Sequence, residues 1–282
     1  MNETSPKTDL RILYEKYYTK TNISTDCIDF FDEHIKPDYD NDLIIEPSAG
    51  DGAFSNILFS RYKNVLAYDI MPEHDSIEKQ NFLEMKIPTS WYDRTVHVIT
   101  NPPFGKQSGK AKQFIRKCSR FANTISFILP NSFRKKYMQI PFPSEFHLIN
   151  IKDLPEDSFI FPDGLDTSIL FCCFQVWKKD CNIPGREYIK YKPKSFKFVL
   201  NTENPDFSIR RVGINTGRIS RSIDKTISTH FFIKVNDNID KDKFYNKFSN
   251  VTFPNNINIG SRSINKNELI KTIESISPHT LL

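Results

Sequence analysis

The sequence Val-His-Val-Ile-Thr-Asn-Pro-Pro-Phe at residues 96–104 joins a largely apolar run to a turn. A run rich in β-branched residues is typical of a buried strand. Neither of the two prolines that follow can donate a hydrogen bond to a neighbouring strand, and each holds the residue before it in an extended conformation. We therefore expect a strand that stops at Asn101 and a rigid turn at its carboxyl end, where open α/β sheets bind their ligands.

The turn at 101–104 carries groups that suit chemistry on an exocyclic amine. Such an amine is a poor nucleophile because its lone pair is delocalised into the ring. The side-chain oxygen of Asn101 and the carbonyl of Pro102 could accept both N–H bonds and free that lone pair, with Pro103 keeping the turn rigid. Phe104 could stack on a base turned out of its helix. The same four residues also occur by chance in loops, so alone they only suggest amino-group methylation.

A second motif lies upstream, in the sequence Ile-Ile-Glu-Pro-Ser-Ala-Gly-Asp-Gly-Ala-Phe at residues 44–54. It predicts a strand, a turn of small residues and the start of a helix. Gly50 and Gly52 allow a positive φ and a close approach of the backbone to a ligand. Glu46, at the end of the strand, would suit a positively charged cofactor. The alternative is an ordinary strand-to-helix turn, since two glycines are a weaker signal than the three of the dinucleotide fingerprint.

Together the two motifs resemble motifs I and IV of the S-adenosylmethionine-dependent amino-methyltransferases. The resemblance is strongest to adenine-N6 methyltransferases with the gamma-like order, in which the cofactor motif precedes the catalytic motif and a recognition region follows. Homologues of this kind occur in large DNA viruses and bacterial modification systems. The resemblance covers roughly residues 14–180 and implies an α/β, Rossmann-like methyltransferase fold with a mostly parallel seven-stranded sheet. Its last strands, near 146–151 and 168–177, would form an antiparallel hairpin at the edge.

The resemblance also implies which residues bind S-adenosylmethionine. Tyr18 and Thr19, ahead of an apolar helical face at 27–35, would correspond to motif X and contact the methionine end of the cofactor. Ser24 or Thr25 is a plausible N-cap for that helix; the alternative is a capped surface helix without a ligand. The expected cofactor-binding residues are Tyr18, Thr19, Glu46, Pro47, Ser48, Ala49, Gly50, Gly52, Phe54, Asp69, Ile70, Asn81 and Phe82.

Two of these side chains have specific expected roles. Asp69 ends the predicted strand at 65–70, and an acid at that point of a doubly wound sheet can accept hydrogen bonds from ribose hydroxyls. As a surface acid it would be unremarkable. Asn81 stands where the family usually has an acid for the adenine amino group. Its amide oxygen can accept the same bond.

Basic residues follow the catalytic motif. Lys106 and Lys110 flank the expected target pocket, and Arg134, Lys135 and Lys136 follow the predicted strand at 124–130. All five are candidate phosphate contacts. The basic outer face of the predicted helix at 114–121 is interpreted as a solvated surface. Phe159 and Phe161 could complete a base sandwich opposite Phe104, although core positions are favoured for both.

The predicted organisation is a mobile N-terminus at 1–13, a methyltransferase domain at 14–180 and an accessory or target-recognition region at 187–282. A charged linker with Pro and Gly at 178–186 separates the last two. The C-terminal region reads as small α+β, with strand-like runs at 196–200 and 230–235 and a helix near 266–275. From its size we expect it to bury a core only in contact with the first domain.

The bulk composition limits the partners. The chain has 282 residues, a net charge of +5 and a pI of about 8.8, which is compatible with a nucleic-acid partner. The five cysteines show no C-x-x-C spacing and indicate reduced thiols. No stretch is long and apolar enough for a membrane span, and the start shows no signal-peptide pattern. We expect a cytoplasmic or nuclear protein that binds DNA or RNA, with no membrane and no metal.

The hypothesis is direct methyl transfer from S-adenosylmethionine to adenine N6 in nucleic acid. The absence of a cysteine at the catalytic motif excludes the covalent chemistry of cytosine-C5 methylation. Guanine-N2 methylation of RNA and glutamine-amide methylation of proteins remain open as alternatives. A catalytically inactive methyltransferase fold that serves as a nucleic-acid-binding subunit remains open as well. The sequence leaves open whether the chain forms a homodimer.

Overall fold

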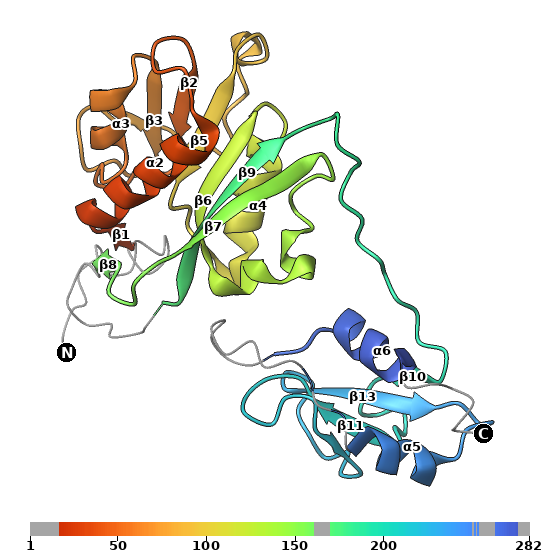
Figure 1. Ribbon diagram of the computed structural model, residues 1–282. Helices are drawn as coiled ribbons and strands as arrows, with labels where there is room; N and C mark the ends of the chain where they lie inside the picture. Colours follow the sequence, from red (N-terminus) through yellow and green to blue (C-terminus); the bar gives the residue numbers. More distant parts are fainter. Residues whose placement is uncertain (1–16, 161–169, 250, 252, 254–262, 276–282) are drawn as a thin grey trace, which may run out of the picture. The chain divides into compact units, whose positions relative to one another are not determined.

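A seven-stranded sheet organises the first part of the computed structural model, which describes residues 17–160, 170–249, 251, 253 and 263–275 (Figure 1). The chain divides between Tyr188 and Ile189 into two compact units. The expected mobile segment at 1–13 lies outside the described residues.

The sheet has the strand order β4-β3-β2-β5-β6-β9-β7. Strands β4, β3, β2, β5 and β6 are parallel to one another, whereas β9 runs antiparallel to both β6 and β7. This confirms the Rossmann-like methyltransferase fold and the antiparallel edge hairpin. The bounds are β2 Leu43–Glu46, β3 Val65–Asp69, β4 Glu78–Lys79, β5 Val96–Thr100, β6 Thr124–Pro130, β7 Phe146–Asp153 and β9 Cys172–Lys179.

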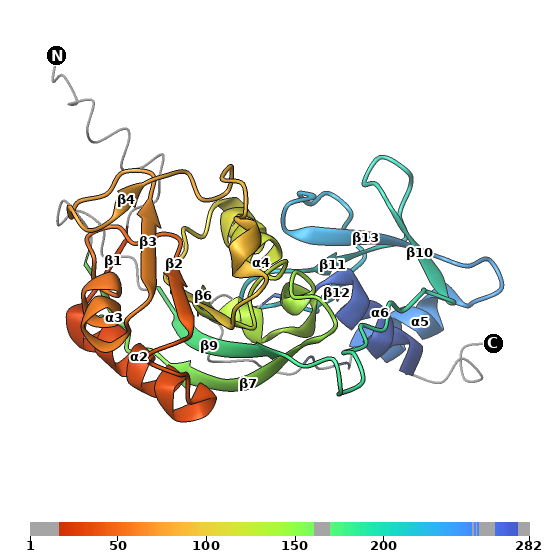
Figure 2. The same ribbon diagram turned by 90° about the horizontal axis from the view of Figure 1, so that it is seen from above.

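Both faces of the sheet are covered, which explains why β2 and β5 are buried at every position. Ile44 faces the cluster formed with α2 (Thr21–Ile35) and α3 (Ser55–Arg61), whereas its neighbour Ile45 faces the cluster formed with α4 (Gly109–Cys118). Side chains alternate across a strand, so adjacent apolar residues serve opposite cores. Figure 2 shows α2 and α3 on one side of the sheet and α4 on the other.

The start of α2 differs from the sequence prediction. The helix begins at Thr21 with Lys20 as N-cap, and no side chain caps it. Ser24 therefore lies inside the helix, and the expected N-cap role of Ser24 or Thr25 is wrong. The Ser24 hydroxyl instead donates to the carbonyls of Thr21 at 2.9 Å and Ala53 at 2.7 Å. It thereby ties α2 to the glycine-containing turn after β2.

A short ladder joins the segment before α2 to the segment before β9. Strand β1 (Tyr18–Thr19) pairs antiparallel with β8 (Phe159–Ile160). Phe159 is buried in the core beside α2 and α3, in line with the favoured core interpretation. Phe161 lies outside the described residues. The ladder holds Tyr18 and Thr19 in place although no long strand contains them.

Within its described residues, the first unit also contains four short 3-10 helices. They are η1 Thr89–Trp91, η2 Lys106–Ser108, η3 Asn131–Arg134 and η4 Lys136–Gln139. Helix η2 directly precedes α4, and η3 directly follows β6. The basic residues predicted to contact phosphates therefore lie in or beside short helical turns rather than on long loops.

In the part of the second unit that the structure describes, a four-stranded antiparallel sheet is accompanied by two helices. Its strand order is β10-β13-β11-β12, and it has its own cluster of buried aromatic and aliphatic side chains. This corrects the expectation that residues 187–282 bury a core only against the first domain, because aromatic side chains supply enough buried surface within the unit. The bounds are β10 Phe196–Val199, β11 Phe207–Arg210, β12 Ile219–Ser220, β13 His230–Val235, α5 Lys241–Ser249 and α6 Lys266–Ser275.

Within the residues that the structure describes, no helix combines the length and the apolar character that crossing a membrane requires.

Candidate cofactor and target pocket

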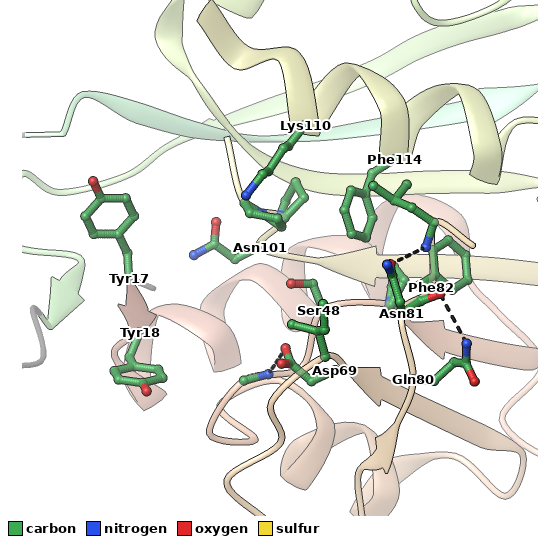
Figure 3. A pocket seen from close by; sticks show the side chains of 16 residues that line it. Tyr17, Tyr18, Ser48, Asp69, Gln80, Asn81, Phe82, Asn101, Lys110 and Phe114 are labelled. Atoms are coloured by element: carbon green, nitrogen blue, oxygen red, sulfur yellow. Dashed lines mark hydrogen bonds between the residues drawn. The ribbon is translucent and has the colours of Figure 1, made fainter. Parts of the chain in front are cut away.

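A cavity of about 260 Å³ opens at the carboxyl ends of the parallel strands. Strands β3, β2 and β5 are neighbours and parallel, so the turns that follow them meet at one edge of the sheet. Figure 3 shows the side chains that converge there. The lining residues are Tyr17, Tyr18, Pro47, Ser48, Gly50, Asp69, Ile70, Gln80, Asn81, Phe82, Leu83, Asn101, Pro102, Pro103, Lys110 and Phe114.

Asp69 connects the ends of β2 and β3. One carboxylate oxygen accepts the backbone N–H of Gly50 at 2.9 Å, and the other accepts that of Met71 at 2.7 Å (Figure 3 draws the bond from Gly50). Gly50 has φ +56° and takes the left-handed conformation that favours glycine. The carboxylate thus holds the turn in shape. Asp69 lines the cavity, and its oxygens have lone pairs left, because a carboxylate can accept about four bonds.

Tyr18 forms one wall of the cavity against this turn. A Cβ atom added to Gly50 would lie 3.7 Å from the Tyr18 ring, so the ring packs directly on the glycine backbone. The Tyr18 hydroxyl donates to the carboxylate of Glu73, and the Glu73 N–H donates to the Gly50 carbonyl at 3.1 Å. Tyr17 also lines the cavity, which the sequence analysis did not predict.

The side-chain amide of Asn101 is held in one orientation at the end of β5. Its Nδ2 donates to the hydroxyl of Thr19 at 3.1 Å, and Thr19 itself is buried. Its Oδ1 is buried and has no hydrogen-bond partner among the described residues. An unpaired buried carbonyl oxygen costs about 1–3 kcal/mol. Asn101, which the sequence predicted to be catalytic, therefore has a buried hydrogen-bond acceptor without a donor among the described residues.

The other residues of the catalytic motif divide between cavity and core. Pro102 and Pro103 line the cavity. Phe104 does not line it; its half-buried ring packs against both clusters of the first unit. The Phe104 carbonyl accepts the N–H groups of Lys110 at 3.1 Å and Ala111 at 3.2 Å, which fixes the start of α4.

The residues of the cofactor motif at 44–54 are likewise divided between the cavity lining and the core. Pro47, Ser48 and Gly50 line the cavity, whereas Ala49 and Phe54 are buried in the core. Gly52 has φ +91°, a conformation that residues with a side chain rarely adopt, and an added Cβ would lie 2.9 Å from the side-chain amide of Asn56, which would have to shift. Its role is to shape the turn that carries the lining residues.

Glu46 is buried at the end of β2 and is not among the residues that line the cavity. Burial raises the pKa of its carboxyl well above the ordinary value; Ser55 opposes that rise, and the charges of Asp69 and Asp51 add to it. Its Oε2 has no hydrogen-bond partner among the described residues. This oxygen is thus a second buried polar atom without a partner among the described residues, in addition to the Oδ1 of Asn101.

The far side of the cavity is built from the segment after β4 and from α4. Phe82 stacks on Phe114 with ring centroids 5.8 Å apart. The Asn81 side-chain oxygen accepts the N–H of Leu83 at 3.2 Å, and Gln80 donates to the Asn81 carbonyl at 3.2 Å. Both bonds are drawn in Figure 3. Gln80, Leu83 and Phe114 line the cavity without having been predicted.

The five predicted phosphate contacts are placed differently. Lys110 lines the cavity, and in Figure 3 its side chain reaches towards Asn101. Lys106 and Lys136 are exposed. Arg134 forms an ion pair with Asp153, and Lys135 is buried. The structure therefore brings one of the five into the cavity.

Comparison with known proteins adds little. No protein-family model matches the chain, and no curated protein matches it. Solved structures that are similar include a protein from Pyrococcus horikoshii assigned as an RNA methyltransferase, with 17% identity, a TM-score of 0.44 and coverage of 60% of this chain and 88% of the other. The modification subunit of an assigned type I restriction enzyme from Vibrio vulnificus has 14% identity, a TM-score of 0.43 and coverage of 93% and 63%. The functional proposal therefore rests on the site itself.

Proposed function

We propose that this chain transfers a methyl group from S-adenosylmethionine to the N6 amino group of adenine in DNA or RNA. The observation that carries the proposal is the orientation of Asn101. Its Oδ1 is buried without a partner among the described residues, while its Nδ2 is held by Thr19. An acceptor prepared in this way suits an incoming N–H donor, because a new bond would remove the cost of the unpaired oxygen.

The residues around the cavity fit the proposed cofactor. The Asp69 oxygens have lone pairs left for ribose hydroxyls, and Ile70 and Phe82 offer apolar contact for an adenine ring. When bound, S-adenosylmethionine would supply a methyl group carried on a positively charged sulfur.

The protein's own contribution to the reaction would be to align the target amine with the methyl group and to polarise its N–H bonds. Asn101 Oδ1 accepts one N–H bond of the target amine, and the Pro102 carbonyl accepts the other. Both bonds increase the electron density on nitrogen and favour the tetrahedral geometry needed for attack. Pro102 and Pro103 stiffen the turn, so the two acceptors need little reorganisation. After transfer the nitrogen loses one proton to solvent, and no covalent bond to the protein forms.

A nucleic-acid substrate is supported by the cationic side of the cavity. Lys110 contributes to the lining beside Asn101, and Lys106 is exposed on the preceding turn. Lysine ammonium groups at the opening of a target pocket would position a phosphate backbone. Arg134, Lys135 and Lys136 remain candidate contacts, with Lys136 the most accessible of the three.

The test is methyl transfer by the Asn101→Ala variant. With radiolabelled S-adenosylmethionine and matched DNA and RNA pools, the parent chain should produce N6-methyladenine, identified by mass spectrometry of the nucleosides. The variant should lose turnover by roughly a hundredfold or more, since it loses an aligning contact. Cofactor binding, measured by calorimetry, should be retained. Loss of cofactor binding in the variant would remove Asn101 from the catalytic assignment.

One observation favours a second candidate, a methyltransferase fold without activity that binds nucleic acid as a subunit. Phe104 packs into the core and does not line the cavity, so the expected stacking face is not presented there. The same assay separates the candidates, because a scaffold would bind nucleic acid and yield no methylated nucleoside. Guanine-N2 or glutamine-amide methylation would appear in it as a different product or only with a protein substrate.

A further inference from the structure

The second unit contains a separate cavity of about 210 Å³. It lies where β10 and β13 pair and α6 begins, since Val199 is paired with Phe232 and Lys266 is the first residue of α6. Among the described residues, its lining contains three basic side chains and no acidic one. The lining residues are Phe198, Val199, Leu200, Arg211, Ile227, His230, Phe231, Phe232 and Lys266.

Arg211 is the most constrained of the basic groups. Its backbone N–H donates to the carbonyl of Thr229 and its carbonyl accepts the N–H of Ile264, both at 2.9 Å, so its main chain is held from two sides. Its guanidinium lies 5.1 Å from the centre of the Phe231 ring. Its Nε is buried and has no hydrogen-bond partner among the described residues. A buried N–H of a cation without an acceptor is costly, and an anionic ligand would supply that acceptor.

Lys266 and His230 extend the donor set. The Lys266 ammonium lies 4.5 Å from the centre of the Phe198 ring. The nearby acid of the same helical turn, Glu268, accepts the backbone N–H of Asn265 at 2.9 Å and serves the helix start. Burial and the charges of Arg210 and Lys225 lower the pKa of His230. A neutral imidazole among cations can still donate one N–H bond to an anion.

The rim of the cavity is apolar. Leu200 and Ile227 are both more than half exposed, at 55% and 54%. A free inorganic anion would make no use of these side chains. A phosphodiester strand would, because its sugars and bases can cover apolar surface while its phosphates contact the cations.

We infer that this cavity binds the phosphate backbone of a single-stranded segment of nucleic acid, with Arg211 and Lys266 as the phosphate contacts. The assignment deepens the proposed function, on which it rests for the identity of the substrate. It places a part of substrate binding on residues outside the methyltransfer pocket.

The test uses the full chain and fluorescently labelled single-stranded DNA and RNA oligonucleotides of one sequence, with affinity measured by anisotropy over a range of salt concentrations. The double variant Arg211→Gln/Lys266→Gln should bind at least roughly tenfold more weakly. Its slope of log affinity against log salt should be smaller by about 1.4, the value for two lost phosphate contacts on a single strand.

The matched control is Lys271→Gln, since Lys271 is exposed on the same helix and does not line the cavity. It should change the affinity by less than about twofold for a surface contact. An equal loss in the control and in a single Arg211→Gln variant would overturn the inference, because it would indicate a general charge effect. Thermal unfolding of each variant shows whether the fold is retained.

The outcomes separate this inference from the proposed function. If the parent chain methylates adenine and the double variant binds the strand like the parent, the cavity assignment fails alone. If the parent binds neither strand, the cavity assignment and the nucleic-acid substrate fail together. If adenosine monophosphate binds in an Arg211-dependent manner more tightly than the strand, the ligand is a free nucleotide and the strand assignment is overturned.

Discussion

At the scale of single residues, the hydrogen bond between Asn101 and Thr19 matters most for function. It joins side chains that are 82 positions apart in the sequence. Since Nδ2 is occupied by Thr19, the amide cannot rotate without losing a bond, and Oδ1 stays where it is. Thr19, expected to touch the cofactor, is therefore proposed as a positioning residue for the catalytic amide.

This role predicts the behaviour of Thr19→Val, which keeps the shape of the side chain and removes the acceptor hydroxyl. Turnover should fall by roughly fivefold, because one neutral hydrogen bond contributes about 1 kcal/mol. The KM for S-adenosylmethionine should stay unchanged. Thr19→Ser is the matched control and should restore turnover. If the KM for S-adenosylmethionine rose and turnover did not fall, Thr19 would be a cofactor contact, and the positioning role would be contradicted.

At the scale of elements, the carboxyl end of β5 leads into the candidate site, whereas its amino end makes structural contacts. Asn101 follows its carboxyl end, whereas His97 lies near its amino end, away from the cavity. His97 is buried, with Nε2 2.9 Å from an Asp42 carboxylate oxygen and Nδ1 2.8 Å from the Thr124 hydroxyl. These contacts link the start of β5 to the loop before β2 and to β6. Burial lowers the pKa of His97, against the opposing effect of Asp42.

The sign of this shift predicts how stability depends on pH. In the unfolded chain His97 takes up a proton near its ordinary pKa of 6.5, whereas in the folded chain it stays neutral to lower pH. The unfolded state therefore binds more protons below that value, and the free energy of unfolding falls as the pH is lowered. We expect the urea midpoint to decrease between about pH 7.5 and pH 5.5.

Substitution of His97 checks that the effect comes from this side chain. In His97→Gln the fall of the midpoint with pH should be smaller, although the variant is less stable at neutral pH because the buried bonds are disturbed. The matched control is His74→Gln, since His74 is exposed on a turn. A pH slope as steep in His97→Gln as in the parent chain would show that other groups cause it.

At the scale of the whole molecule, the two units have separate cores. The first unit buries the side chains around its sheet in two large clusters, and the second buries those around Phe207, Phe244 and Leu269 in its own. A compact unit with its own apolar core can in general fold alone. We therefore expect each unit to fold as a separate fragment when the chain is divided between Tyr188 and Ile189.

We expect the fragment 1–188 to fold and to bind S-adenosylmethionine within about threefold of the full chain, because the lining of the first cavity comes from that unit alone. The fragment 189–282 should unfold cooperatively in a thermal scan followed by circular dichroism. Failure of 1–188 to bind the cofactor, while the full chain binds it, would show that the first unit depends on the second.

The sequence by itself determined the elements and the location of the site. Apolar runs of β-branched residues, prolines that stop a strand and glycines that allow a positive φ act over a few neighbouring residues, so strands such as β5 and turns such as that at Gly50 are predictable without a structure. Parallel strands then bring their carboxyl ends to one edge, which is why Asp69, Asn81 and Asn101 line one cavity.

Only the tertiary structure decided which way the individual side chains face and what they contact. Glu46 and Phe104 are adjacent in sequence to lining residues, but neither lines the cavity. Glu46 is buried, and the half-buried ring of Phe104 packs against the core clusters. Thr19 reaches Asn101 because β1 pairs with β8, a contact between distant segments. The second unit's core and its basic cavity likewise depend on pairing between separate strands. Such contacts follow from packing of the whole chain, which local residue preferences do not encode.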